Sequence, residues 1–246
     1  MRRASGATRR QWNSVVLWDF DGTIASTWED IYFTLNEVGK NMGWNIPDSV
    51  RTESAYRILS AEDIASKVVP EAGDTDLCKF ASLVRTHYRK ENPFNSTQMY
   101  PGLQMLLSNL NDVGCASYIV TAKPREALER ILRVKHWSHY FASWYCLEET
   151  DELADKQQLV SRVVKEHQES TNKFKLIGDS FNDMQAACSN GIPFIAALYG
   201  EGDLNFDDPR QRSCLMSASQ SICLARSPRD LKKFFSGELE ELRDDI

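Results

Sequence analysis

Short apolar runs that alternate with helix-like stretches constrain the fold of this 246-residue chain more than any other feature. Runs typical of buried strands occur at residues 15–18, 117–120, 174–177 and 193–197, with a weaker one at 220–224. Amphipathic patterns with helical spacing occur at residues 103–110, 127–132, 159–164 and 227–234. This alternation predicts an α/β fold, Rossmann-like, in which helices cover both faces of a parallel sheet to give three layers.

One long interval departs from the alternation. Between residues 26 and 97 we find no convincing strand, but helix-like stretches at 28–42, 61–69 and 76–90. A connection of this length is too long for an ordinary loop between strands. We therefore expect a small α-helical cap at residues 26–97, inserted into a core made of residues 14–25 and 98–235. A disordered basic leader (1–13) and an acidic tail (236–246) would flank that core.

Charge and composition exclude several classes of protein. The chain has 29 Lys and Arg against 35 Asp and Glu, a formal charge of −6, whereas a nucleic-acid-binding protein usually has a basic excess. No apolar run approaches the length of a membrane span. The six cysteines are scattered without a CxxC pair, which is typical of reduced thiols in a cytoplasmic protein. We expect neither a nucleic acid nor a membrane as partner.

The most informative segment directly follows the first expected strand and reads Asp19-Phe20-Asp21-Gly22-Thr23. Side chains two residues apart in an extended chain point to the same side, so both carboxylates should face one place. Two acids this close repel each other, and a cation would relieve that repulsion. Open parallel sheets bind ligands beyond the carboxyl ends of their strands, which is where this pair stands.

Two other strand ends carry matching groups. The second strand ends in Thr121-Ala122-Lys123-Pro124, and the third ends in Gly178-Asp179-Ser180-Phe181-Asn182-Asp183. Lys156 begins the helix that precedes the third strand and could reach the same edge. Carboxylate oxygens of this kind suit Mg²⁺. Four carboxylates, a hydroxyl and one or two lysines at one edge indicate phosphoryl transfer.

The order Asp-x-Asp-Gly-Thr, strand-end Thr, Lys and Gly-Asp-x-x-x-Asp resembles the haloacid dehalogenase superfamily, and most of all its branch of phosphoglycolate phosphatases. Further matches are Tyr100-Pro101-Gly102 before a Leu-rich helix, Tyr140-Phe141 before a short strand, and Ser227-Pro228 near the end. The resemblance extends over residues 14–235. It implies a Rossmann-like core with an inserted helical cap.

The resemblance also implies the chemistry of the acids. Asp19 would be the nucleophile that takes up the phosphoryl group as an aspartyl-phosphate. Asp21 would protonate the leaving alcohol and then activate the hydrolytic water. Asp19, the Asp21 carbonyl, Asp179 and Asp183 would hold Mg²⁺, with Asp183 acting directly or through water.

Asp19 also belongs to the implied phosphate-binding set, together with Thr121, the Ala122 N–H group and Lys156. Lys156 is assigned from order and spacing, because Asp155-Lys156-Gln157-Gln158 stands where the family commonly reads Lys-Pro-x-Pro. Lys123 could line the site or only occupy the turn, and we leave it outside the catalytic set.

The acid at position 21 helps to tell the branches of the superfamily apart, because the dehalogenases of the superfamily lack an acid at that position. Its helical-cap sugar phosphomutases usually carry a His soon after Gly-Thr, and none occurs here between Gly22 and His87. We therefore expect a Mg²⁺-dependent phosphatase that acts on a small phosphorylated metabolite, such as phosphoglycolate, a sugar phosphate or a nucleotide. The alternatives are a receiver-like signalling module that accepts a phosphoryl group, a phosphomutase of the same superfamily, and a scaffold that has lost activity.

Overall fold

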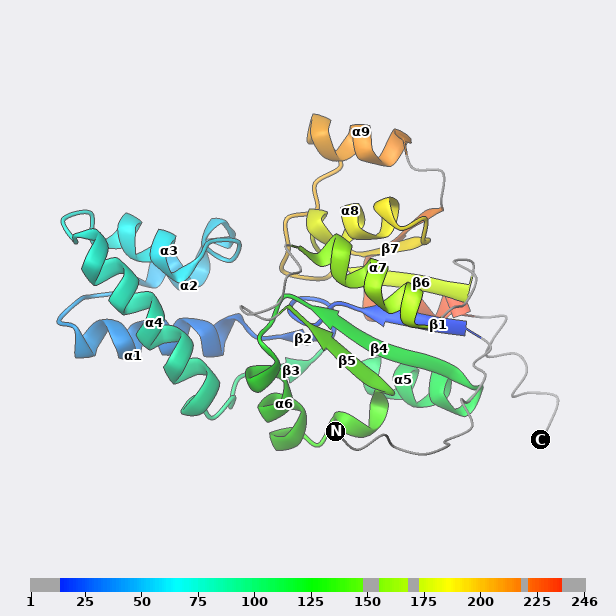
Figure 1. Cartoon of the computed structure of the whole chain (residues 1–246), viewed down its shortest axis with the longest axis horizontal. Helices are drawn as coiled ribbons and strands as arrows, with labels where there is room; N and C mark the ends of the chain where they lie inside the picture. The colour runs from blue at the N-terminus through cyan, green and yellow to red at the C-terminus, as the bar shows by residue number, and fades with distance from the viewer. Residues whose placement is uncertain (1–13, 148–154, 168–172, 218–220, 236–246) are drawn as a thin grey trace.

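The computed structural model describes residues 14–147, 155–167, 173–217 and 221–235, and within these ranges the chain forms a six-stranded parallel sheet (Figure 1). The strands lie in the order β5-β4-β1-β6-β7-β8. Their bounds are Ser14–Trp18 (β1), Cys115–Thr121 (β4), Ser143–Cys146 (β5), Phe174–Gly178 (β6), Phe194–Ala197 (β7) and Ile222–Ala225 (β8). The predicted α/β fold is confirmed.

Strand β1 lies in the interior of the sheet, between β4 and β6, and all of its residues are buried. It pairs in parallel with β4, from Ser14 opposite Cys115, and with β6, from Val15 opposite Phe174. Near-continuous apolar strands of this kind are typical of sheets that are covered on both faces. The carboxyl ends of β4, β1 and β6 therefore lie next to one another at one edge of the sheet.

Helices cover both faces of this sheet. They are α5 (Leu103–Asp112), α6 (Arg125–Val134) and the 3₁₀ helix η4 (Pro228–Phe235) on one face, and α7 (Lys156–His167) and α8 (Phe181–Ser189) on the other. Val16 and Trp18 of β1 pack toward the first group, whereas Val15 and Leu17 pack toward the second. Successive strand side chains point to opposite faces, so one short strand serves both cores.

A group of helices stands to one side of the sheet, between β2 (Ala25–Ser26) and β3 (Gln98–Met99) (Figure 1). They are α1 (Trp28–Asn41), α2 (Asp48–Thr52), the 3₁₀ helix η1 (Ser54–Tyr56), α3 (Ala61–Val68) and α4 (Asp74–Lys90). They share a hydrophobic cluster of their own, in which Leu35, Ile64 and Phe80 are at most 2% exposed. We call the helices from α1 to α4 the helical unit.

Buried polar contacts tie together the two chain segments that enter and leave the helical unit. Strands β2 and β3 pair antiparallel. The buried Asp30 carboxylate in α1 accepts hydrogen bonds from the N–H (2.6 Å) and the hydroxyl (2.7 Å) of Thr97. The side-chain amide of Asn92 donates to the Asp30 carbonyl at 2.7 Å. Since buried polar groups are costly to leave unpaired, these bonds fix the base of the helical unit.

Sequence patterns missed the elements that lack an apolar stripe. These are the helices α2, η1, α9 (Pro209–Ser217) and η2 (a 3₁₀ helix, Ser138–Tyr140), and the two-residue strands β2 and β3. The helix expected over residues 227–234 is 3₁₀ throughout η4. The expected leader (1–13), the acidic tail (236–246) and the start of the weak strand at Gln220 lie outside the described residues. Within the described ranges, no helix has both the length and the apolar character that a membrane crossing requires.

Candidate active site

Asp19 is held at the carboxyl end of β1 by backbone pairing that continues past the strand. Its N–H donates to the carbonyl of Ile177 in β6 at 2.9 Å, which extends the β1–β6 ladder by one residue. The chain then turns tightly, because the N–H groups of Ile24 and Ala25 both donate to the Phe20 carbonyl. Asp19 is 6% exposed, so a buried carboxylate stands at the edge of the sheet.

Asp179 follows β6 and is surrounded by backbone. Its carboxylate accepts from the Glu201 N–H at 2.9 Å and from the Thr23 hydroxyl at 3.3 Å. Gly22 lies against it with φ +77°, and a Cβ atom there would stand 1.8 Å from an Asp179 oxygen. Any side chain at position 22 would therefore collide with the carboxylate, in addition to being strained at positive φ. The Gly of the Asp-x-Asp-Gly-Thr motif has a direct steric reason here.

Asp183 has two roles in the structure. It forms a capping box with Ser180 at the start of α8, in which one Asp183 oxygen accepts from the Ser180 N–H (3.0 Å) and hydroxyl (2.6 Å). The carboxylate is fully buried, and its other oxygen contacts the Lys156 ammonium group. The cap thus orients an acid that also belongs to the site.

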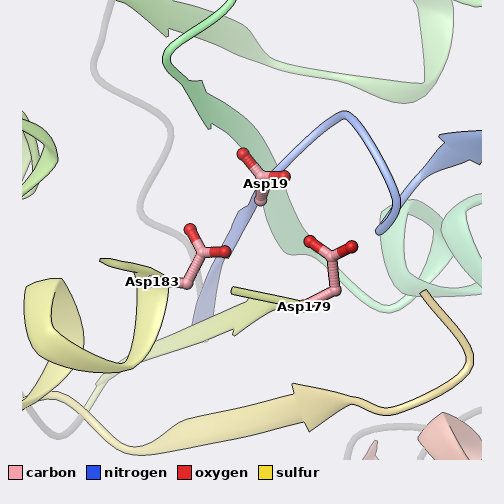
Figure 2. Close-up of side chains that lie close together, drawn as sticks. All are labelled: Asp19, Asp179 and Asp183. Carbon is pink, nitrogen blue, oxygen red and sulfur yellow. The ribbon is translucent and has the colours of Figure 1, made fainter. Parts of the chain in front are cut away.

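Asp19, Asp179 and Asp183 point toward one another (Figure 2), and one oxygen from each lies within 4.8 Å of the others. Burial, opposed by Lys156 and reinforced by the other two acids, raises the pKa of Asp19 well above its ordinary value. Burial and the Asp183 charge raise the pKa of Asp179 to about 7. Hard oxygen donors that repel one another in a buried space are a suitable ligand set for a divalent cation such as Mg²⁺.

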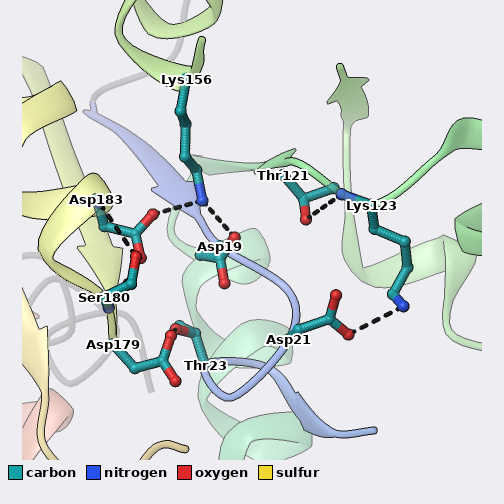
Figure 3. Close-up of polar contacts among 9 residues, drawn as sticks. All are labelled: Asp19, Asp21, Thr23, Thr121, Lys123, Lys156, Asp179, Ser180 and Asp183. Atoms are coloured by element: carbon teal, nitrogen blue, oxygen red, sulfur yellow. Dashed lines mark hydrogen bonds and ion pairs between the residues drawn. The ribbon is translucent and has the colours of Figure 1, made fainter. Parts of the chain in front are cut away.

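The ammonium group of Lys156, at the first residue of α7, joins two of these acids. It forms ion pairs with Asp19 and Asp183, and all three side chains are buried (Figure 3). Burial opposes its charge, yet the Asp183 and Asp19 carboxylates raise the pKa of Lys156 above its ordinary value. Lys156 pairs with two of the three converging carboxylates, which leaves negative charge for a cation to balance.

Asp21 lies in the same turn but has different partners (Figure 3). Its carboxylate forms an ion pair with Lys123 at 3.1 Å and accepts from the Thr27 hydroxyl. Lys123 also donates to the hydroxyl of Tyr88 in α4 at 2.9 Å, with its ammonium 4.6 Å from the centre of that ring. The sequence left the role of Lys123 open, and no local pattern indicated Tyr88, because its contact depends on how the helical unit packs against the core.

Thr121 ends β4 with its side chain buried, and its hydroxyl oxygen accepts from the Lys123 N–H at 3.1 Å. Thr121 and the neighbouring Ala122 line a cavity of about 350 Å³, together with Asp19, Asp21, Lys156 and Asp179. Asp183 lies behind this wall, in contact with Lys156. The structure thus brings all seven residues singled out from the sequence to one edge of the sheet.

The helical unit contributes the opposite wall of the cavity. Trp28 and Ile31 come from α1, and Arg57 and Ile58 come from the loop between η1 and α3. Sequence reasoning named none of these four residues as functional. Only their apolar or basic character was visible in the sequence, without a strand end or motif to place them.

Comparisons with known proteins show which family the chain is similar to. Residues 16–197 match the family model described as haloacid dehalogenase-like hydrolase. A phosphoglycolate phosphatase from Aquifex aeolicus is 27% identical over 79% of this chain and 89% of its own length. A 5'-nucleotidase from Pseudomonas aeruginosa is 24% identical over 76% of this chain and 83% of its own.

The fold has close counterparts among solved structures. A haloacid dehalogenase-like family hydrolase from Streptococcus pneumoniae superposes with a TM-score of 0.72 at 20% sequence identity, over 90% of this chain and 98% of that one. The family match covers well over half of the chain and includes the turn after β1 and the acids after β6. The chain belongs to the haloacid dehalogenase-like hydrolase family.

Proposed function

We propose that the protein is a Mg²⁺-dependent phosphatase that hydrolyses a small phosphomonoester through an aspartyl-phosphate on Asp19. The observation that carries this proposal is the convergence of Asp19, Asp179 and Asp183 around Lys156, beside a cavity of about 350 Å³. The enzyme class is a phosphoric monoester hydrolase. The names of several relatives make phosphoglycolate one candidate substrate.

In the first step an Asp19 oxygen attacks phosphorus and the bond from phosphorus to the leaving oxygen breaks, while Asp21 gives its proton to the departing alcohol. In the second step Asp21 takes a proton from water as that water attacks phosphorus, and Asp19 is released with inorganic phosphate. Lys123 stays beside Asp21 through both steps and holds its carboxylate at the cavity wall.

Thr121, the Ala122 N–H group and Lys156 bind the phosphoryl oxygens in this proposal. Asp19, the Asp21 carbonyl, Asp179 and Asp183 would hold Mg²⁺, which when bound shields the phosphoryl charge from the nucleophile. Residues 26–97 act as a cap that excludes water and selects the leaving group. Trp28 and Ile58 in the cavity wall support this assignment.

Replacing Asp21 by Asn should slow turnover by about 100-fold or more, because the leaving alcohol loses its proton donor and the water loses its base. Inorganic phosphate should still bind, because Asp21 is outside the proposed phosphate-binding set. Steady-state kinetics with a generic aryl phosphate and calorimetric titration with phosphate measure the two effects. Turnover close to that of the wild type would remove Asp21 from its acid–base role.

The acid cluster predicts how stability depends on pH when metal is removed. The folded pKa of Asp179 is raised to about 7 from 3.8, so the folded state binds this proton more tightly than the unfolded state does. Stability of the EDTA-treated protein should therefore fall as pH rises from about 4 to about 7. Mg²⁺ competes with protons for the same oxygens, so it should raise Tm more at pH 8 than at pH 5.

Thermal unfolding with EDTA or Mg²⁺ across this pH range tests the prediction, and Asp179→Asn is the matched variant. The Asn variant should lose the part of the pH dependence that comes from Asp179, while Asp19, whose pKa is also raised, keeps its own part. An equal Mg²⁺ effect at pH 5 and pH 8 would contradict the proposed metal site.

A further inference from the structure

The two walls of the cavity differ in chemistry. The edge of the sheet supplies acids and lysines suited to a phosphoryl group, whereas the helical unit supplies Trp28, Ile31, Arg57 and Ile58. Ile58 is 63% exposed, although large apolar side chains are usually covered. A leaving group that enters this side of the cavity would meet an apolar surface and one guanidinium group.

Arg57 differs from the lysines of the cavity in having no acidic partner. Lys156 pairs with Asp19, and Lys123 pairs with Asp21. Within the described ranges, the Arg57 side chain forms neither an ion pair nor a hydrogen bond, and its Nε atom is buried without a partner. Buried N–H groups of folded proteins are almost always hydrogen-bonded, so this donor lacks the acceptor that such a group normally has.

Glu201 lines the same cavity, but its carboxylate is not a partner of the Arg57 guanidinium group. It accepts from the Ser26 hydroxyl and forms no ion pair with Arg57. The loop that carries Arg57 is itself fixed, because the Arg57 N–H donates to the Ser54 carbonyl at 3.0 Å. The guanidinium group is therefore presented to the cavity by an ordered turn with its hydrogen-bonding capacity unused.

We propose that Arg57 binds a second anionic group on the substrate, a carboxylate or a second phosphate carried by the leaving alcohol. This inference rests on the proposed phosphatase function and specifies its substrate class. The planar guanidinium group matches carboxylate and phosphate oxygens in two parallel hydrogen bonds. The carbon chain of the substrate would lie against Ile58, which lines the same cavity as Arg57.

Three esters of similar length test this proposal: phosphoglycolate, ethylene glycol bisphosphate and ethyl phosphate. The wild-type enzyme should hydrolyse one of the two anionic esters with a kcat/KM about 10- to 100-fold above that for ethyl phosphate, which lacks the second anion. The preferred ester tells a carboxylate from a phosphate. Arg57→Met should reduce this selectivity by about the same factor, and Arg57→Lys should restore part of it.

Arg51→Met is the matched control, since this arginine also lies in the helical unit but pairs with Glu29 on the surface at 2.9 Å. Its selectivity should equal that of the wild type. Binding supplies a readout without turnover: in an Asp19→Asn background, Arg57→Met should weaken calorimetric binding of the preferred ester about tenfold or more.

The outcomes separate this inference from the phosphatase proposal. If all three esters are hydrolysed without preference, or if Arg57→Met keeps the full selectivity, the role of Arg57 is overturned while the phosphatase proposal stands. If no ester and no aryl phosphate is hydrolysed in the presence of Mg²⁺, the proposed function fails and the Arg57 inference fails with it.

Discussion

Asp19→Asn should lower phosphate release by at least about a thousandfold, because the amide cannot act as the nucleophile that accepts the phosphoryl group. Asp19 is the acid that lies at the end of β1, contacts Lys156 and lines the cavity. Release of phosphate from an aryl phosphate with Mg²⁺ measures the effect.

The same variant should fold at least as stably as the wild type. Burial and the charges of Asp183 and Asp179 outweigh the attraction of Lys156 for the Asp19 carboxylate, so an uncharged amide is tolerated there. Lys156 keeps its ion pair with Asp183 in this variant. Asp207→Asn, at an exposed acid away from the cavity, serves as the control and should keep wild-type turnover. A folded Asp19→Asn protein that retains most of its activity would overturn the nucleophile assignment.

Lys156→Met should destabilise the protein by about 3–5 kcal/mol at neutral pH, the usual cost of breaking a buried ion pair from one side. The Asp19 and Asp183 carboxylates would remain buried without their shared ammonium group. Turnover should also fall about 100-fold or more, because a charged donor to the phosphoryl oxygens is lost. Urea unfolding and aryl phosphate kinetics measure the two effects.

The pH dependence of this loss has a defined sign. Lys156 opposes the raised pKa of Asp19, so without it the Asp19 carboxylate takes up a proton more readily in the folded state. The destabilisation should therefore be smaller at pH 5 than at pH 8. Lys165→Met is the control, since this lysine is exposed on the same helix α7. Equal stability of Lys156→Met and Lys165→Met would show that the buried ion pair contributes nothing.

Much of the site could be predicted from the sequence because parallel strands place their carboxyl ends at one edge. Apolar runs located β1, β4 and β6, and the residues that directly follow them had to meet there. This pattern alone placed Asp19, Thr121 and Asp179 at that edge, whereas their expected roles came from the resemblance to a family. Lys156 followed from its position at the start of the helix before β6.

The remaining contacts depend on packing between segments that are distant in the chain. The partnership of Lys123 with Tyr88 joins the turn after β4 to α4, and Arg57 reaches the cavity from a loop of the helical unit. Periodicity predicts that α1 and α4 are helices, but not which of their ends approaches the sheet. The wall of the cavity that the helical unit forms could therefore not be predicted from the sequence, whereas the wall at the edge of the sheet could.

The central claim is that the acids after β1 and β6 form one pocket in which Asp19 receives a phosphoryl group. Its most direct test is peptide mass spectrometry of acid-quenched Asp21→Asn protein that has been mixed with Mg²⁺ and p-nitrophenyl phosphate. This ester has a good leaving group and needs little proton donation, so the phosphorylated protein should accumulate when the hydrolytic water lacks its base. We expect phosphorylation on Asp19. It should be absent from the double variant that also carries Asp19→Asn, and absent when EDTA is present. A protein that turns over the ester yet never carries phosphate on Asp19 would contradict the account.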